Sequence, residues 1–142
     1  MQIKLVAIGK IKENIYKNRI YEYLKWINID IPIEIVFIKN DRIDKLNKKL
    51  KSHLINQDYT ICISEEGTMM NSRKFSKLIL NQTKNITFFI GGPNGHSEIV
   101  RKETNEVISL SLMTFPHDLA LLILTEQIYR GISIAKGSKY HK

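Results

Sequence analysis

The 142-residue sequence has little that would indicate a secreted or membrane protein. It contains a single cysteine, Cys62, which cannot form an internal disulfide, and we expect its thiol to be buried and inert within an apolar run. The longest strongly apolar run, residues 119–124, falls far short of the roughly 18 residues that a membrane span requires. Residues 1–6 alternate as a strand does and lack the apolar stretch of a signal peptide. We therefore expect a cytoplasmic protein without a membrane partner.

Several catalytic and metal-binding motifs are also missing. None of the four histidines has a second histidine at the helical spacing of a zinc site, so we predict no metal. The sequence has no Walker-type Gly-Lys-Ser/Thr, no Gly-x-Gly-x-x-Gly turn and no Gly-x-Ser-x-Gly elbow. These absences count against a phosphate-binding loop and against a serine hydrolase.

Acidic side chains are in the minority. Twenty-two lysines and arginines face 14 aspartates and glutamates, which gives a net charge of +8. The excess has two interpretations: a lysine-rich surface that keeps the protein soluble, or a polyanionic partner such as nucleic acid. The C-terminal segment favours the second, because it carries Arg130, Lys136, Lys139 and Lys142 with no acidic residue.

Hydropathy patterning predicts one domain, residues 1–142, in which strands alternate with helices. We predict strands at residues 3–8, 33–38, 59–63, 86–90 and 107–110, and helices at residues 11–27, 41–55, 72–82, 97–103 and 117–135. This order is typical of an α/β fold with a mostly parallel sheet flanked by helices. Residues 119–124 would be apolar all round the last helix, and a dimer interface is the simplest way to bury them.

Ligands of parallel sheets bind beyond the carboxyl ends of the strands, which directs attention to residues 91–96 and 110–117. The first segment, GGPNG at residues 91–95, has two interpretations. It is either an ordinary tight turn or a turn whose glycines let a ligand approach the backbone. His96 and His117 flank these segments, and each could also cap a helix.

Four segments in the C-terminal half occur together in the order of one known family. They are FFIGGPNG at 88–95, SLSLMTFPH at 109–117, EQIYR at 126–130 and YHK at 140–142, and the opening IKLVAIGK at 3–10 also agrees. The chain thus resembles the large-subunit rRNA pseudouridine N3-methyltransferases of the SPOUT class (the RlmH family). It departs from the family pattern by a shorter middle region, by His96 where leucine is common, and by Leu121 where arginine is frequent.

The resemblance implies a homodimer with a deep C-terminal trefoil knot, in which the last helix passes through a loop. The knot holds S-adenosylmethionine in a bent conformation. Family contacts to this cofactor fall on eight residues of the present sequence: Ile63, Gly91, Leu110, Ser111, Leu112, Met113, Thr114 and Phe115. Seven of them lie in the two segments selected above, and Ile63 ends the strand predicted at residues 59–63.

The reaction implied is methylation of N3 of a pseudouridine in large-subunit rRNA. The sulfonium already makes the methyl group electrophilic, so the protein chiefly positions the acceptor, whose N3 must lose a proton. We expect Tyr140, His141 and Arg130 to surround the target base with help from a partner subunit, and His141 is the candidate general base. Lys136, Lys139 and Lys142 would hold phosphates of rRNA, either free or in the assembled ribosome.

Two other functions are compatible with parts of the sequence. A catalytically inactive, knotted RNA-binding dimer would keep the fold and the basic C-terminus. A nucleotide-binding α/β domain of flavodoxin-like topology is the other alternative, but the missing phosphate-binding fingerprint counts against it. The sequence leaves open which nucleotide is modified, whether it must already be pseudouridine, and whether intact ribosomes are needed.

Overall fold

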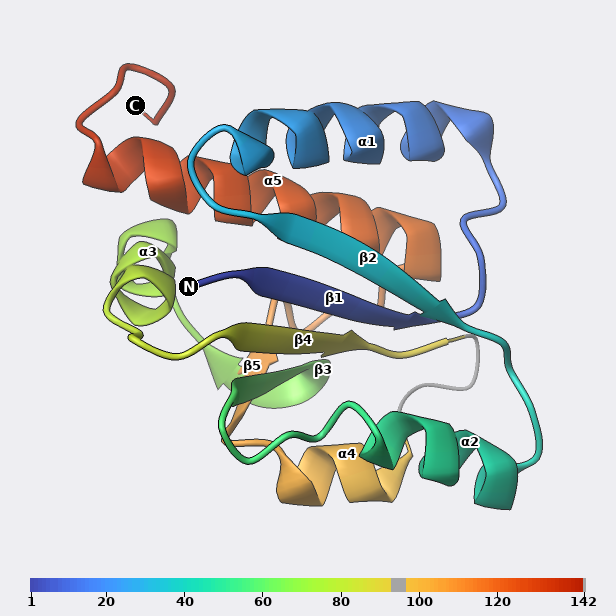
Figure 1. The fold of residues 1–142 in the computed structure, drawn as a ribbon. Helices are drawn as coiled ribbons and strands as arrows, with labels where there is room; N and C mark the ends of the chain where they lie inside the picture. Colours follow the sequence, from blue (N-terminus) through green and yellow to red (C-terminus); the bar gives the residue numbers. More distant parts are fainter. Residues whose placement is uncertain (93–96, 142) are drawn as a thin grey trace.

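The computed structural model of the chain describes residues 1–92 and 97–141. It contains the predicted alternation of strands and helices (Figure 1). The strands are β1 (Ile3–Ile8), β2 (Ile33–Ile38), β3 (Tyr59–Met69), β4 (Ile86–Ile90) and β5 (Glu106–Ser109). The helices are α1 (Asn14–Asn28), α2 (Ile43–Lys51), α3 (Ser72–Leu80), α4 (Glu98–Glu103) and α5 (His117–Ala135).

The five strands form one sheet in the order β2-β1-β4-β3-β5, and every pair in it is parallel. The predicted α/β fold with a mostly parallel sheet is therefore confirmed. Because all strands run the same way, their carboxyl ends meet at one edge. In Figure 1, α1 and α5 lie side by side above the sheet, and α2 and α4 lie below it.

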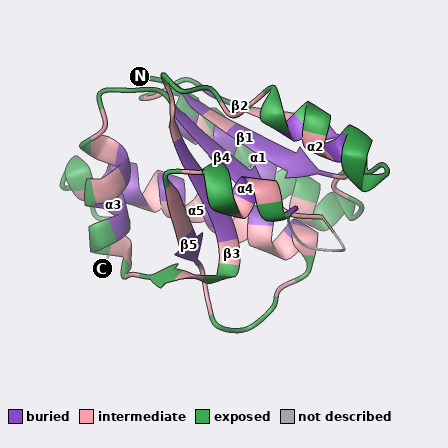
Figure 2. Ribbon diagram, turned by 90° about the horizontal axis from the view of Figure 1, so that it is seen from below, coloured by how far each residue is buried: buried purple, intermediate pink, exposed green. Residues whose placement is uncertain are grey.

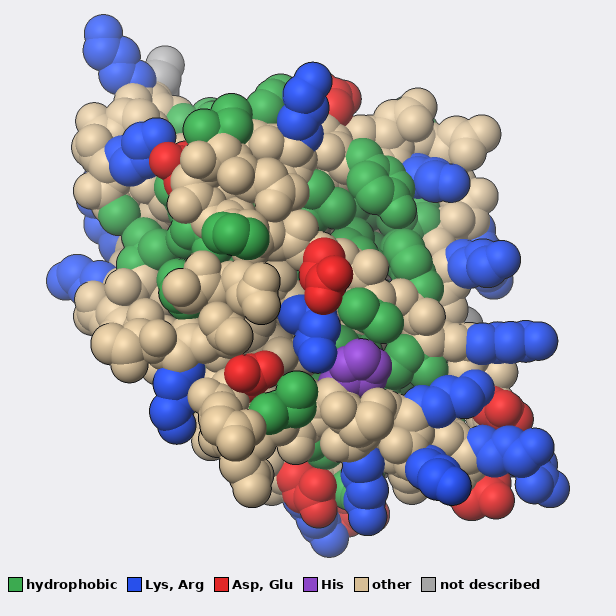
Figure 3. All heavy atoms as spheres, in the orientation of Figure 1, with side chains coloured by type: hydrophobic (Ala, Val, Ile, Leu, Met, Phe, Trp, Pro, Cys, Tyr) green, Lys and Arg blue, Asp and Glu red, His purple; other side chains and the backbone are tan. Residues whose placement is uncertain are grey.

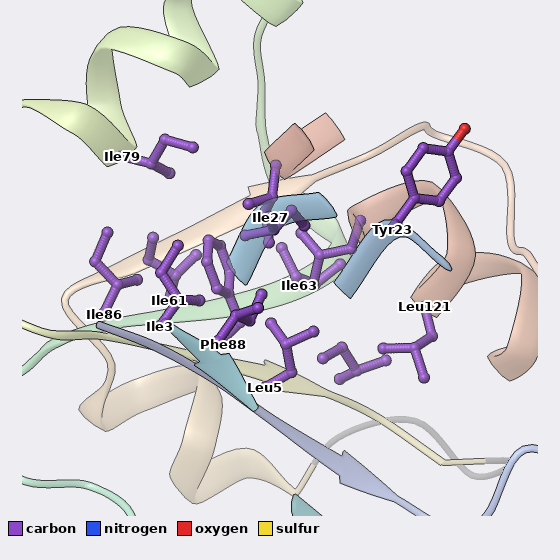
Figure 4. Close-up of a cluster of buried hydrophobic side chains, with 14 of the residues drawn as sticks. Ile3, Leu5, Tyr23, Ile27, Ile61, Ile63, Ile79, Ile86, Phe88 and Leu121 are labelled. Carbon is purple, nitrogen blue, oxygen red and sulfur yellow. The ribbon is translucent and has the colours of Figure 1, made fainter. Parts of the chain in front are cut away.

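Alternating strand residues feed two apolar cores, one on each face of the sheet. Leu5 and Phe88 belong to the larger core, which is closed by α1, α3 and α5 and is drawn in Figure 4. Their neighbours Val6 and Phe89 belong to the smaller core beneath α2 and α4. Cys62 lies in this smaller core with no exposed surface, so its predicted burial is confirmed, and burial raises the pKa of its thiol to about 12.

Tertiary contacts move several element ends from their predicted positions. β3 continues past the predicted Ile63 because its extension pairs with β5 a second time, after a bulge that separates Ile63 from Thr68. α1 begins at Asn14 and not at residue 11, because the backbone of Glu13 is extended; the Asp118 carboxylate accepts the N–H groups of Lys12 and Glu13 just before the helix.

Helix α3 begins at Ser72, as predicted, and its N-cap is Asn71. The side chain of Asn71, and not that of Ser72, accepts the Lys74 N–H at 2.9 Å. The Ser72 hydroxyl instead donates to Gln127 of α5 at 2.6 Å, which joins the two helices.

Helix α5 is only partly covered within one chain. Leu121, where the resemblance anticipated a polar residue, is fully buried, as are Leu124 and Ile128. Leu119, Leu122 and Ile123 keep intermediate exposure, and Figure 2 shows that intermediate burial runs along much of this helix. The expectation that residues 119–124 are buried on nearly every side is thus not met by a single chain. None of the described helices is long and apolar enough to cross a membrane.

Candidate functional site

A cavity of about 400 Å³ lies at the carboxyl edge of the sheet. Ile63 of β3 and Ile90 of β4 form its floor, and the connection from β5 to α5 forms one wall. The size falls within the roughly 300–1,000 Å³ typical of small-molecule sites. The remaining lining residues are Ser64, Glu65, Glu66, Gly91, Gly92, Arg101, Leu110, Ser111, Met113, Thr114, Phe115, His117 and Ala120.

The structure brings together most of the residues selected for cofactor binding. Seven of the eight line the cavity: Ile63, Gly91, Leu110, Ser111, Met113, Thr114 and Phe115. Leu112 is not part of the lining, and 74% of its surface is exposed. The connecting segment is shaped by two short contacts, in which Ser109 Oγ donates to the Ser111 carbonyl at 2.7 Å and Ser111 Oγ accepts the Met113 N–H at 3.0 Å.

His117 connects the two segments that were selected because they follow strand ends. Its Nδ1 lies 2.8 Å from the carbonyl oxygen of Gly91, and because a carbonyl only accepts, Nδ1 carries the proton. The opposite nitrogen, Nε2, is buried and has no hydrogen-bond partner in the described part of the chain. A buried acceptor without a donor is costly, so a donor supplied by a ligand would stabilise this arrangement. His96, the other flanking histidine, and residues 93–95 lie outside the described residues.

Three charged side chains line the cavity that the sequence interpretation did not select. Glu65 and Glu66 belong to the bulge of β3, and Thr114 Oγ1 donates to Glu65 Oε1 at 3.4 Å. Arg101 comes from α4, and it is the one lysine or arginine among the lining residues that the structure describes. Glu65 and Glu66 could have been found from their place after a buried strand, whereas the spacing of Arg101 gives no such signal.

A second cluster forms around Glu126 near the end of α5. Its Oε1 accepts three hydrogen bonds, from Arg130 Nε at 2.9 Å, from Arg130 Nη2 at 2.6 Å and from the Tyr140 hydroxyl at 3.0 Å. The Arg130 guanidinium also lies over the ring of Tyr140, 4.8 Å from its centre. The hydroxyl of Tyr23 on α1 lies 3.2 Å from that of Tyr140, so the C-terminus is attached to two helices.

Within this cluster the three predicted catalytic residues touch one another. Arg130 Nη1 lies 3.1 Å from His141 Nδ1, and since a guanidinium only donates, Nδ1 is the acceptor. Burial, followed by the hydrogen bonds with Tyr23 and Glu126, raises the pKa of Tyr140 well above its ordinary value. The hydrogen bond to Glu126 raises the pKa of Arg130. Tyr140 is therefore a protonated donor at neutral pH, and Arg130 is a permanent cation.

The predicted RNA-binding lysines extend from the same end of α5. Lys136 Nζ lies 3.1 Å from an oxygen of Asp30, and Lys139 is exposed to solvent. Lys142 lies outside the described residues. The C-terminal cluster is far from the cavity in the same chain, because His117 and Arg130 are thirteen residues apart on one helix, which corresponds to about 20 Å.

Groups of three or more residues able to hold a metal ion do not occur among residues 1–92 and 97–141. The groups that the cavity offers are its apolar floor, the backbone of Gly91, the orphaned nitrogen of His117 and three charges. This combination of apolar and polar groups suits a ligand that has an apolar ring and carries both positive and negative charges.

Comparison with known proteins places the chain in a class. Residues 1–141 match the family model described as "Predicted SPOUT methyltransferase". The chain belongs to the SPOUT methyltransferase family.

Relatives from several bacteria match along the whole chain. Proteins named "Ribosomal RNA large subunit methyltransferase H" are 38% identical in Dictyoglomus thermophilum, over 99% of both chains, and 36% identical in Coprothermobacter proteolyticus, over 100% of both. The protein of that name from Streptococcus sanguinis is 35% identical, again over 100% of both chains. The family assignment made from four C-terminal segments is thereby confirmed.

Solved structures share the fold at low sequence identity. A probable methylase family protein from Haemophilus influenzae superposes with a TM-score of 0.58 at 10% identity, covering 99% of this chain and 70% of that one. The methyltransferase AviRb from Streptomyces viridochromogenes, solved with the cofactor AdoMet, gives 0.52 at 9% identity over 91% and 57%. These likenesses concern the fold alone.

Proposed function

We propose that this chain transfers a methyl group from S-adenosylmethionine to ribosomal RNA, at N3 of a pseudouridine of the large subunit. The observation that carries the proposal is the cavity at the carboxyl edge, where seven residues selected for cofactor binding converge. The names of the full-length relatives, which are rRNA methyltransferases, support the same reaction. The nucleotide and its state before methylation rest on the family resemblance.

The residues present fit S-adenosylmethionine. The apolar side chains of Ile63, Leu110 and Phe115 suit the adenine ring, and the Gly91 backbone has no side chain to hold a ligand away. The buried Nε2 of His117 lacks a donor, which the hydroxyl and amino groups of the cofactor can supply. Glu65 and Glu66 complement its sulfonium and ammonium charges, and Arg101 complements its carboxylate.

When bound, the cofactor supplies a methyl group that is already electrophilic. The chain itself must bind the cofactor, orient its methyl group and exclude water. His117 fixes the position of the Gly91 carbonyl through its 2.8 Å contact, and the Ser109–Ser111 contacts shape the opposite wall. Rigid walls of this kind hold a reacting group in line with its acceptor, which is the main source of rate for a transfer of this type.

A homodimer with a composite active site is part of the proposal. The cluster of Arg130, Tyr140 and His141 lies about 20 Å along α5 from the cavity of its own chain, too far to contact a substrate there. A second copy, packed on the half-buried face of Leu119, Leu122 and Ile123, would bring its own cluster to the cavity. The deep trefoil knot around the β5–α5 connection also belongs to this proposal.

In that arrangement each residue of the C-terminal cluster has a defined role. Arg130 stabilises the anion that forms at N3, because its charge is permanent and its orientation is fixed by Glu126. Tyr140 donates a hydrogen bond to Glu126 and so helps to hold this carboxylate beside Arg130. His141 accepts the N3 proton once its Nδ1 leaves Arg130. If His141→Ala methylates at the wild-type rate, with normal RNA binding, the role of His141 is wrong.

The test is calorimetric titration of the purified protein with S-adenosylmethionine. Wild type should bind one cofactor per chain at saturation, and Gly91→Leu should abolish binding by filling the cavity. Leu112→Ala is the control, because this exposed residue lies on the β5–α5 connection that forms a cavity wall but is not part of the lining. A folded wild-type protein that binds RNA and no cofactor would contradict the proposal and indicate an inactive RNA-binding dimer.

A further inference from the structure

A row of basic residues lies beside the cavity at the same edge of the sheet. Lys10 and Lys12 follow the end of β1, and Lys39 and Arg42 follow the end of β2. The two strands are in register, with Ile8 opposite Ile38, and the Gly9 N–H donates to the Ile38 carbonyl at 2.8 Å. Both connections therefore leave the sheet side by side. We call residues 10–12 and 39–51 the basic rim.

The basic rim is fixed to the same turn of α5 that shapes the cavity. Asp118 Oδ2 accepts the N–H of Lys12 at 3.0 Å and that of Glu13 at 3.3 Å. Its neighbour His117 contacts Gly91 in the cavity wall. Strands are about 4.8 Å apart, and β2 is two places from β4 in the sheet, so the end of β2 lies about 10 Å from the cavity floor.

Positive charge continues from this edge along α2. Residues 39–51 carry six lysines and arginines but only two aspartates. Those aspartates pair locally, Asp41 with Lys49 at 3.4 Å and Asp44 with Arg42 at 3.7 Å. The exposed lysines of the rim that form no ion pair within the described chain are Lys10, Lys12, Lys39, Lys45, Lys48 and Lys51. Figure 3 shows lysine and arginine side chains gathered along the right-hand margin, over these connections and α2.

The chemistry of this surface suits a flexible polyanion better than a membrane. A membrane-surface helix turns an apolar face outward, but the apolar face of α2 is used inside the molecule, with Leu46 and Leu50 only 7% and 1% exposed. Unpaired lysines on mobile side chains bind phosphates through the release of counterions. Several such lysines at spaced positions can contact successive phosphates of an RNA backbone.

We propose that the basic rim binds the backbone phosphates of the substrate RNA that flank the target nucleotide. This inference rests on the proposed function, since it takes the RNA as substrate. The rim belongs to the protomer whose cavity performs the reaction, whereas the basic C-terminus comes from the second copy. The RNA is then held on two sides of the cavity, by Lys10, Lys39 and Lys45 of one chain and by Lys136 and Lys139 of the other.

The experiment compares two triple variants that lose the same charge. Lys10→Gln/Lys39→Gln/Lys45→Gln removes unpaired lysines of the rim. Lys74→Gln/Lys77→Gln/Lys84→Gln removes three exposed lysines from α3 and the turn before β4 and serves as the control. The probe is a transcribed fragment of large-subunit rRNA, with its affinity measured from 0.05 to 0.3 M salt, and intact large subunits are used for methylation rates.

The rim variant should bind the RNA fragment on the order of tenfold more weakly at 0.1 M salt, with a salt slope shallower by about two units. Its affinity for S-adenosylmethionine should not change, and KM for RNA should rise while kcat is kept. Equal losses in the control variant, or no loss in the rim variant, would overturn the inference. If wild type binds RNA through the rim but binds no S-adenosylmethionine, the proposed function fails and the rim still stands.

Discussion

Arg101 is the side chain that best tests how the cavity recognises its ligand. It is the one permanent cation in the described lining, and it faces a cavity that also holds Glu65 and Glu66. The methionine part of S-adenosylmethionine carries a carboxylate next to two positive groups. We expect Arg101 to bind that carboxylate, since hydrogen bonds to charged groups are among the stronger ones in proteins.

Arg101→Gln should weaken S-adenosylmethionine binding by about ten- to a hundredfold, since a hydrogen bond to a charged group contributes about 1.5–3 kcal/mol. Decarboxylated S-adenosylmethionine should bind the variant and the wild type equally, because the group that Arg101 recognises is gone. Calorimetric titration of both ligands measures the difference. Lys102→Gln, an exposed neighbour paired with Glu98 at 3.0 Å, is the control. Equal losses for both ligands would mean that Arg101 acts on the fold and not on the carboxylate.

Cys62 should be unreactive in the native protein. Burial raises the pKa of its thiol to about 12, so at pH 8 only about one molecule in ten thousand carries the reactive thiolate. Iodoacetamide should therefore label the protein only as fast as it unfolds, and labelling should be complete within minutes in denaturant. Mass spectrometry at several times gives the rate. Rapid native labelling at pH 8 would contradict the burial of Cys62.

At the scale of single elements, the hydrophobic pattern predicted the bounds of a strand or helix correctly where tertiary contacts do not extend or shorten that element. β1, β2, β4 and α5 have the predicted bounds. β1 and β4 are central strands and α5 is a long apolar helix, in which burial dictates the pattern, and β2 is an apolar edge strand paired along its whole length with β1. β3 was predicted too short, because residues 64–68 are polar or small, and the end of the extension pairs only once β5 is beside it. The start of α1 was also missed, since the extended residues before it contact Asp118, more than a hundred residues away.

The bulge of β3 depends on Gly67. A Cβ atom at this position would lie 2.6 Å from the backbone of Val107 and Ile108, so β3 and β5 could not keep their present distance. Gly67→Ala should destabilise the protein by about 1–3 kcal/mol, as overpacking does, and weaken cofactor binding by displacing Glu65 and Glu66. Denaturant unfolding and calorimetry measure the two effects.

Gly131→Ala is the comparison for that substitution. Its added Cβ would meet the flexible Ile79 Cδ1 at 3.1 Å and the Ser76 Cα at 3.3 Å, less closely than at Gly67, and alanine is favoured over glycine within a helix by about 1 kcal/mol. The loss of stability should be smaller than for Gly67→Ala, and cofactor affinity should be unchanged. A larger effect at Gly131 would show that the α3–α5 contact, and not the bulge, is the less tolerant one.

At the scale of the whole molecule, the cavity could be predicted from sequence better than the site as a whole. The rule for strand ends and the family resemblance selected seven of its lining residues. Arg101 was missed because α4 is brought to the cavity by the packing of the second face of the sheet, which no spacing encodes. The distance between the cavity and the C-terminal cluster was also absent from the sequence interpretation, because it follows from the length and direction of α5.

That distance leads to a prediction about mixed dimers. Gly91→Leu should close the cavity of a chain and leave its C-terminal cluster intact, and Arg130→Gln should do the reverse. Each variant alone should be nearly inactive in rRNA methylation. Because a composite site pairs the cavity of one chain with the cluster of the other, a purified heterodimer should contain one intact site and recover about half of the wild-type rate.

The heterodimer is obtained by coexpressing the two variants with different affinity tags and purifying on both. A heterodimer that joins wild type to the Gly91→Leu, Arg130→Gln double variant is the control. It has the same mutations on one chain, so each composite site contains one damaged part and it should be inactive. If both sites were formed within single chains, the outcomes would be exchanged: the control would keep about half of the activity and the mixed variant would have none. The two arrangements therefore predict opposite results from the same four preparations, and a protein that remains monomeric would exclude the composite site altogether.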